Sequence, residues 1–188
     1  ASARFGYSAK QTLNLMQSLY ETHKVLTYPR TDSRYLTKDI VPTLKERLDA
    51  VSIGPYKTLA QQAKRRPLKE KPGFVNDAKV SDHHAIIPTM EFVQKGFDGL
   101  AEGEKKLLSL VCCKLLCAVA APHVYEAVTA TFTCAGNEFT AKGKTILTPG
   151  WKEIERRFKA SFKTDADEDA PELARELPEI TEGQTFDP

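Results

Sequence analysis

The chain has 188 residues, of which 41% are hydrophobic and 28% are charged, a composition typical of a folded globular protein with one large or two small domains. No apolar run reaches the length of about 18 residues that a membrane-spanning helix needs, and the first residues, ASARFGYSAK, lack the apolar stretch of a secretion signal. The absence of an initial Met suggests a segment of a longer protein.

The formal net charge of +2 is divided unevenly along the chain. Residues 1–122 contain 19 Lys and Arg and 12 Asp and Glu, which gives +7, whereas residues 123–188 contain 8 and 13, which gives −5. A basic first part is compatible with a polyanionic partner, although scattered surface lysines are the commoner cause of such an excess.

The first predicted helix begins after Ser8, because Gln11 lies three residues further on and completes a capping-box pattern. Its apolar residues recur at helical spacing and predict an end near His23. A short extended segment is expected next, since Pro29 keeps Tyr28 out of the helical region. The apolar face of the helix consists of Leu13, Leu15, Met16, Leu19 and Tyr20.

Three more helices are predicted before residue 122. Thr37 is suited to cap one that has Pro42 near its start, a second covers 55–65, and a third covers 104–121. Residues 66–82 are polar and contain proline, which predicts a loop. The apolar faces comprise Ile40, Leu44, Leu48 and Val51 in the first of these helices, and Leu107, Leu108, Val111, Leu115 and Ala118 in the last.

A β hairpin is predicted after residue 122, because the period of the sequence changes there. Residues 126–134 alternate with the period of a strand, 135–137 (Ala-Gly-Asn) form a turn signal, and FTAKGK continues a second strand. Residues 147–188 are expected to add further β structure or loop, with a solvated acidic loop at 164–172.

The expected fold class is therefore α+β, with a mainly helical domain over 1–122 followed by a mainly β segment over 123–188. The cysteines do not have the spacing of a zinc site, and three of the four lie in one apolar helical run, so free, buried thiols in a reducing compartment are expected. They are Cys112, Cys113, Cys117 and Cys134.

The segment TYPRTDS is the first candidate site. Tyr28 offers a phenol oxygen that can attack phosphorus if a base or cationic surroundings assist the loss of its proton. In an extended chain Arg30 projects to the same side and can grip the attacked phosphate, Asp32 can hold Arg30, and Arg34 extends the basic character. For a lone Tyr-x-Arg, a turn with a half-buried tyrosine is the commoner explanation.

The segment SDHHAIIPT is the second candidate site. The imidazoles of His83 and His84 can donate hydrogen bonds to a phosphate oxygen. Adjacent histidines in an extended segment point to opposite sides, which makes joint metal ligation awkward, so no metal site is predicted in the chain. Taken alone, a surface or capping histidine pair is the commoner explanation.

Three motifs in order, RFGYSAKQTLNLMQSLYE, LTYPRTDSRYL and SDHHAIIPT, are similar to those of type IA DNA topoisomerases, and the last two resemble the topoisomerase III branch more than the topoisomerase I branch. The resemblance implies that Tyr28 attacks a single-stranded DNA phosphate and becomes joined to its 5′ end. It implies that Arg30 neutralises that phosphate, that His83 contacts a phosphate near the cut, and that His84 occupies the place of a glutamate. It also implies that Gln17 and Glu21 line the same region. Asp32 and Arg34, which follow Arg30 in the TYPRTDS segment, are expected to belong to the DNA-binding residues as well.

The same resemblance implies that other domains of the same polypeptide complete the enzyme. A Toprim domain, which this chain lacks, would supply the acidic residues that hold Mg²⁺, while 123–188 would form part of a β arch. The Asp-x-Asp patterns at 165–169 do not follow an apolar strand and are expected to be solvated loop. The implied protein works without ATP on cytoplasmic nucleoid or plasmid DNA, with no membrane partner, and the chain alone is expected to be inactive in relaxation.

The alternative from a different class is a non-catalytic helical module that binds single-stranded DNA, which the basic first part would also suit. A tyrosine recombinase or relaxase is disfavoured, because its Arg/His constellation or metal-binding histidine triad cannot be assembled from His23, His83, His84 and His123 at these positions.

Overall fold

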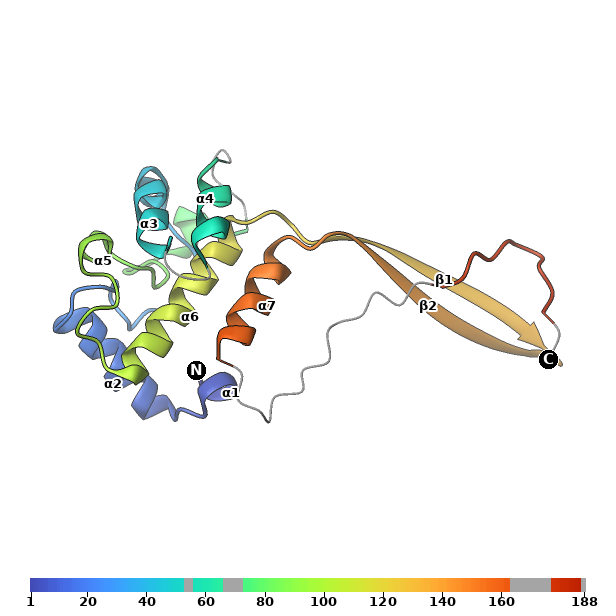
Figure 1. The fold of residues 1–188 in the computed structure, drawn as a ribbon, viewed down its shortest axis with the longest axis horizontal. Coiled ribbons are helices and arrows are strands. Elements are labelled where there is room, and N and C mark those ends of the chain that lie inside the picture. The colour runs from blue at the N-terminus through green and yellow to red at the C-terminus, as the bar shows by residue number, and fades with distance from the viewer. Residues whose placement is uncertain (53–55, 66–72, 163–176, 187–188) are drawn as a thin grey trace. The chain divides into compact units, whose positions relative to one another are not determined.

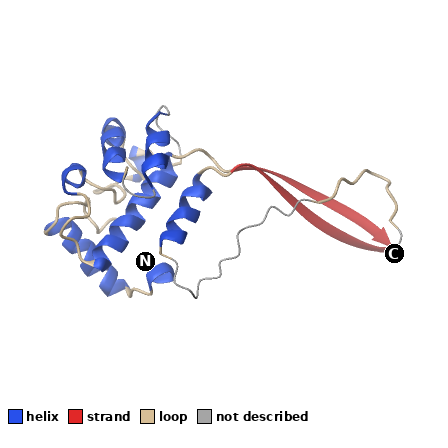
Figure 2. Ribbon diagram, viewed as in Figure 1, coloured by secondary structure: helices blue, strands red, loops and turns tan. Residues whose placement is uncertain are grey.

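The computed structural model describes residues 1–52, 56–65, 73–162 and 177–186, which belong to two compact units. The helical unit comprises Ala1–Ala121 and Trp151–Phe162, and the second unit comprises Pro122–Gly150 and Lys163–Pro188. Helices make up the first unit and a pair of strands dominates the second (Figure 2). The predicted α+β class is confirmed.

The helical unit is assembled around one long helix, α6 (Figure 1). Helices α2, α4 and α7 pack against α6, and α3 packs against α4 and α5. The helices are α1 (Ser2–Phe5), α2 (Ala9–Glu21), α3 (Leu44–Val51), α4 (Lys57–Arg65), α5 (Met90–Lys95), α6 (Glu102–Val119) and α7 (Trp151–Ser161), with short 3₁₀ helices η1 (Lys38–Thr43) and η3 (Asp77–Lys79).

Leucine and phenylalanine side chains from four of these helices form the centre of the core. Leu19, Leu44, Leu48, Phe92 and Leu108 are completely buried. Each such side chain contributes about 1.5–3 kcal/mol through the removal of its apolar surface from water. This core fixes α2, α3 and α5 around the segments that carry the candidate site residues.

Helix α2 begins as the sequence predicts. Gln11 N–H donates to Ser8 Oγ at 3.2 Å, and Ser8 N–H donates to Gln11 Oε1 at 3.0 Å, so both bonds of the capping box are present. The helix ends at Glu21, slightly before the predicted end. Leu13 is 37% exposed, contrary to its expected place on the apolar face, because only the α2 face that contains Met16 meets the core.

The prediction that the Thr37 side chain caps a helix is wrong. The Thr37 side chain makes no capping hydrogen bond, and Pro42 lies inside the 3₁₀ helix η1 that precedes α3. The Lys38 N–H instead donates to Asp77 Oδ1 at 2.9 Å. A carboxylate from a segment far along the chain therefore takes the place of the local hydroxyl.

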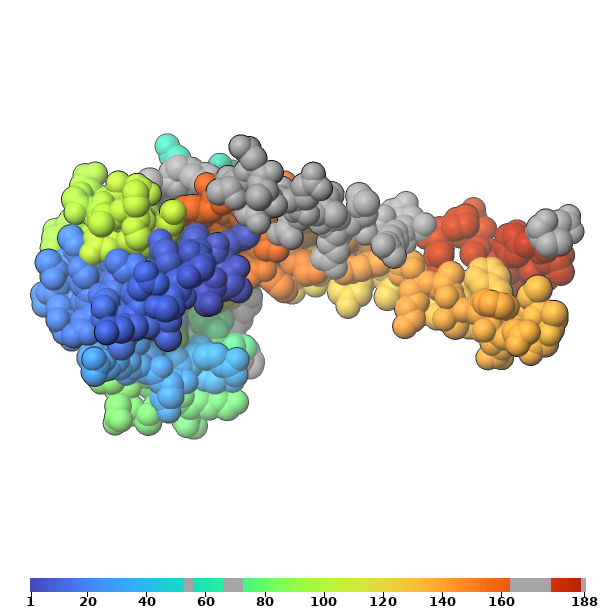
Figure 3. All heavy atoms as spheres, turned by 90° about the horizontal axis from the view of Figure 1, so that it is seen from below, coloured from blue at the N-terminus to red at the C-terminus, as the bar shows by residue number. Residues whose placement is uncertain are grey.

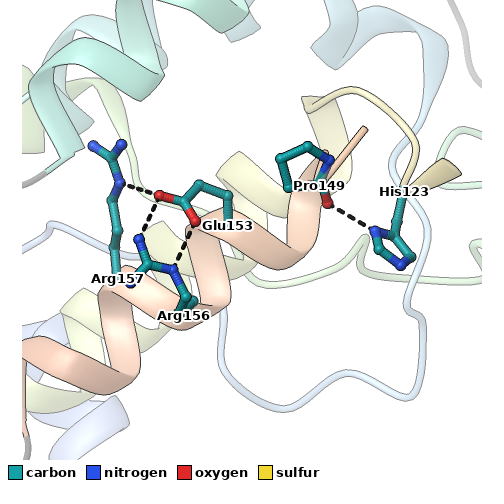
Figure 4. Close-up of polar contacts among 5 residues, drawn as sticks. All are labelled: His123, Pro149, Glu153, Arg156 and Arg157. Carbon is teal, nitrogen blue, oxygen red and sulfur yellow. Dashed lines mark hydrogen bonds and ion pairs between the residues drawn. The ribbon is translucent and has the colours of Figure 1, made fainter. Parts of the chain in front are cut away.

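The predicted hairpin is confirmed as β1 (Val124–Cys134) and β2 (Asn137–Thr148), which pair in antiparallel register. Ala135 and Gly136 form the two-residue turn with φ values of 49° and 78°, the left-handed conformation that a tight hairpin turn of this kind requires. At the base of the hairpin, His123 Nδ1 donates to the Pro149 carbonyl at 3.1 Å (Figure 4).

The expectation of only β structure or loop after residue 147 is wrong, because α7 is a helix. Ile154 and Phe158 lie one turn apart and are buried in the core of the helical unit. On the helix surface Glu153 accepts hydrogen bonds from Arg156 and Arg157 (Figure 4). The Arg156 hydrogen bond is the main reason why the pKa of Glu153 falls to about 2, and it outweighs the opposing effect of burial.

The cysteines only partly match the expectation of buried free thiols. Cys112 and Cys113 are buried free thiols as predicted, whereas Cys134 is a free thiol exposed on β1, contrary to the expectation of burial.

Across the residues with described positions, no helix is long and apolar enough to cross a membrane. The acidic stretch 164–172 with its Asp-x-Asp patterns, and residues 66–72 of the predicted loop, lie outside the described residues.

Candidate DNA-cleavage site

The two motif segments lie side by side because the chain before Tyr28 pairs with the chain after His84. Thr27 N–H donates to the Ile87 carbonyl at 3.0 Å, and Ile87 N–H returns a bond of 3.0 Å to Thr27 Oγ1. One residue away on each segment, Leu26 and Pro88 form an antiparallel bridge. The segment of Tyr28 and the segment of His83 and His84, which are far apart in the sequence, are thereby held next to each other.

Hydroxyl side chains fasten the continuation of the two segments. Thr31 Oγ1 donates to the His83 carbonyl at 2.7 Å, and Ser33 Oγ donates to the Lys79 carbonyl at 2.8 Å. In the space-filling view the light-blue part of the chain adjoins the green part, in agreement with these bonds (Figure 3). Asp32, which lies between Thr31 and Ser33, is therefore flanked on both sides by bonds to the second segment.

A buried arginine that the sequence reasoning missed supports the pairing. Arg47 of α3 is 8% exposed, and its guanidinium donates to the Pro88 carbonyl and to Thr43 Oγ1, the latter at 3.0 Å. Burial lowers the pKa of Arg47 from its very high ordinary value. The spacing of Thr43 and Arg47 on a helix was the only sequence signal, because the carbonyl partner lies in a distant segment.

Tyr28 is half-buried and faces an open depression of about 280 Å³. Its ring centroid lies 4.4 Å from that of His83 and 5.4 Å from that of Tyr20, which meets it edge-on from α2. No hydrogen bond joins the Tyr28 hydroxyl to another residue in the described part of the chain. The phenol is therefore held by its ring while its oxygen stays available.

Arg30 and Asp32 line a second depression of about 470 Å³, which shares Ser81, Asp82 and His83 with the Tyr28 depression. His83 therefore lines both the depression of Tyr28 and that of Arg30. The suggestion that Asp32 holds Arg30 is not met, since no ion pair joins these two exposed side chains. Arg30 is consequently available to an anion from outside the chain.

The remaining predicted residues take up different positions. His84 is half-buried, lines the Tyr28 depression, and donates through Nδ1 to the carbonyl of the next residue at 2.7 Å. On α2, Gln17 Nε2 donates to Glu21 Oε1 at 2.9 Å, beside Tyr20 on the same helix. Arg34 is exposed and lines a third depression with Asp32.

A profile of the DNA topoisomerase family matches residues 1–188. This chain belongs to the DNA topoisomerase family. It is 50% identical to DNA topoisomerase 3 of Bacillus thuringiensis (strain Al Hakam) and of Bacillus anthracis, and 44% identical to that of Bacillus subtilis (strain 168). Each alignment covers 99% of the chain and 25% of the relative, so this topoisomerase chain spans a quarter of the length of these proteins. The resemblance of its motifs to the topoisomerase III branch is confirmed.

The described residues of the topoisomerase chain do not suit a resident magnesium ion. Over the described ranges, no three His, Cys, Asp or Glu side chains are grouped as metal ligands. Mg²⁺ prefers carboxylate oxygens in octahedral geometry.

A buried carboxylate ties α2 to α6 and was not found from the sequence. Glu104 accepts hydrogen bonds from Ser18 Oγ at 2.6 Å and from the Ala101 N–H at 2.9 Å, and its Oε2 lies 3.3 Å from His23 Nε2. Burial acts to raise the pKa of Glu104, but the bond from Ser18 and the other partners outweigh it and hold that pKa below its ordinary value. The cluster fixes the helix from which Tyr20 reaches Tyr28.

We expect Glu104→Gln to lower the free energy of unfolding of the topoisomerase chain by about 1–3 kcal/mol near neutral pH. The amide removes the negative charge that faces His23, and it has one acceptor oxygen where the carboxylate has two. Because the folded-state pKa of Glu104 is depressed, its contribution is present above the ordinary glutamate range and is lost as pH falls through the folded-state value. Denaturant unfolding near neutral pH and at about pH 4 measures both effects.

Glu102→Gln is the matched control, since Glu102 lies on the same helix and is exposed. That variant should stay within about 0.5 kcal/mol of the unmodified chain. If Glu104→Gln and Glu102→Gln unfolded alike at both pH values, the proposed contribution of the cluster would be wrong.

Proposed function

We propose that this chain is the tyrosine-bearing part of a type IA DNA topoisomerase, in which Tyr28 is the nucleophile for a single-stranded DNA phosphodiester. One observation carries the proposal. The Tyr28 ring packs against His83 in an open depression, and the adjoining depression is lined by Arg30. A phosphate that bridges the two depressions would meet a phenol oxygen, an imidazole and a guanidinium together.

The proposed step exchanges one phosphate ester for another. The Tyr28 oxygen forms a bond to phosphorus and loses its proton, while the bond from phosphorus to the 3′ oxygen breaks and that oxygen leaves as a 3′-hydroxyl. The DNA 5′ end remains joined to the tyrosine. Because the new ester retains the energy of the old one, the 3′-hydroxyl can reverse the step without ATP.

Arg30 and His83 provide the charge that this step needs. The guanidinium of Arg30 can hold two phosphate oxygens at once and offsets the charge that grows on them in the transition state. His83, fixed against the Tyr28 ring, can donate to a phosphate oxygen. The flanking residues that would contact the strand are Gln17, Glu21, Asp32, Arg34 and His84.

Other domains of the same polypeptide would complete the reaction. Magnesium held by a Toprim domain would assist rejoining, and the segment 123–188 would belong to a β arch that lets the helical domain lift for strand passage. The chain alone should bind single-stranded DNA weakly and should not relax supercoiled DNA. The proposed setting is the cytoplasm, on nucleoid or plasmid DNA.

Asymmetric labelling tests the proposal in the full-length protein that carries this chain. After incubation with a single-stranded oligonucleotide and a denaturing quench, a 3′ label should travel with the protein, whereas a 5′ label should appear on a shorter free strand. Peptide mass spectrometry should place the nucleotide on Tyr28. A non-catalytic DNA-binding module would instead retain the oligonucleotide before the quench and release it intact afterwards.

A further inference from the structure

A third depression continues the series that begins at Tyr28. It has a volume of about 360 Å³ and is lined by Arg34, Tyr35 and Lys79, together with Asp32 and Ser81, which also line the Arg30 depression. Ser81 lines all three depressions, so they form one continuous path on the surface of the helical unit. The Arg34 depression, which has only Ser81 in common with the Tyr28 depression, is the far end of this path. Of the three groups at this far end, Arg34 is a proposed contact of the strand, whereas Tyr35 and Lys79 have no role in the function proposed for Tyr28.

The far end of the path is built around a lysine held over an aromatic ring. Lys79 Nζ lies 4.8 Å from the centroid of the Tyr35 ring and donates to the Tyr35 hydroxyl at 3.2 Å. The Lys79 carbonyl accepts from Ser33 Oγ, so the backbone on which this lysine stands is tied to the opposite segment. The ammonium group is thus positioned by two contacts before any ligand arrives.

The charges at this end are not neutralised within the described residues. No ion pair joins Lys79 or Arg34 to any residue with a described position, and both side chains are exposed. Asp32 is the one carboxylate among the residues lining this depression, so two cations face one anion there. Because Tyr35 uses its oxygen to accept from Lys79, its O–H proton remains free to be donated.

We propose that Arg34, Tyr35 and Lys79 form a second phosphate subsite, which binds the DNA strand at a phosphate beyond the one attacked by Tyr28. The guanidinium and ammonium groups would contact the phosphate oxygens, and the tyrosine hydroxyl would donate to one of them. Lys79 covers a face of the Tyr35 ring, so this site suits the backbone of the strand better than a stacked base. The inference rests on the proposed function for the path of the strand.

Salt dependence of binding tests the subsite without relying on catalysis. The full-length protein is used with Tyr28→Phe, so that only reversible binding to a single-stranded oligonucleotide is measured. For single strands, each neutralised phosphate contributes about 0.7 to the slope of log affinity against log salt concentration. Arg34→Ala combined with Lys79→Ala should therefore reduce the slope by roughly 0.7.

Two matched variants separate the subsite from a general loss of charge or of the fold. Lys57→Ala removes an exposed cation of α4 that lines none of the three depressions, and its slope should equal that of the unmodified protein. Lys79→Arg keeps the cation and should keep the slope. Equal slopes for the Arg34/Lys79 double variant and Lys57→Ala, at unchanged thermal unfolding, would overturn the proposal.

Failure of the second phosphate subsite can be distinguished from failure of the nucleophile role proposed for Tyr28. With Tyr28 intact, loss of covalent product in the Arg34/Lys79 double variant alone would reflect weaker binding of the strand, because the attacking group and Arg30 are unchanged. Absence of covalent product from the unmodified protein as well would refute the nucleophile. The slope change in the Phe background would still decide whether the far end of the path binds phosphate.

Discussion

Tyr28→Phe in the full-length protein is expected to abolish covalent capture of DNA, because no oxygen remains at this position to form a bond to phosphorus. The phenyl ring keeps the contacts with Tyr20 and His83. The hydroxyl makes no hydrogen bond to any other described residue, so its removal should change the free energy of unfolding by less than about 0.5 kcal/mol. Affinity for single-stranded DNA should likewise be retained.

Denaturing electrophoresis with a 3′-labelled oligonucleotide measures the capture. Tyr20→Phe is the matched control, since it removes a hydroxyl from the neighbouring ring and should leave the adduct in place. A labelled adduct on the Tyr28→Phe protein would show that another residue is the nucleophile. In that case Tyr28 would be a packing residue, and the likeness to topoisomerases would reflect ancestry more than chemistry.

Arg30→Ala is expected to slow cleavage by roughly 30-fold to 1,000-fold, equivalent to about 2–4 kcal/mol of lost transition-state stabilisation. The guanidinium is exposed and forms no ion pair with Asp32, so little folding energy depends on it. The defect should therefore appear in the rate of the first cleavage at saturating DNA. Single-turnover measurement of adduct formation gives that rate directly.

Arg30→Lys should recover part of the rate, because an ammonium supplies the charge without the two-pronged geometry of a guanidinium. Arg65→Ala, at an exposed position on α4, should have no effect on the rate. An Arg30→Ala protein that cleaves as fast as the Arg65→Ala protein would contradict the role proposed for Arg30.

The position of His83 gives these two predictions a common physical basis. Its ring touches that of Tyr28, and it lines the depression of Arg30 as well. The site therefore depends on the pairing that Thr27 makes with Ile87 and on the support that Arg47 gives to Pro88. The contact of Arg47 with Pro88 lies away from the reacting groups, but it helps to set the distance between the TYPRTDS and SDHHAIIPT segments.

Local rules account for the elements that were predicted well. The capping box of Ser8 and Gln11 involves residues three apart, and the turn at Ala135 and Gly136 joins strands whose alternation is visible in the sequence. Helix α5 has six residues, which is too short for a periodic signal. Helix α7 has few apolar positions among many charges, so its burial was evident only once the core was formed.

By itself the sequence determined the α+β class, the start of α2, the hairpin and, through its motifs, membership of the topoisomerase family. Only the tertiary structure decided that His83 lies against Tyr28, that Asp77 caps η1, and that Glu104 joins α2 to α6. The physical reason is the separation in the sequence between the residues that interact. Caps, turns and periodicity depend on neighbours in the chain, whereas these contacts depend on how a shared hydrophobic core brings distant segments together.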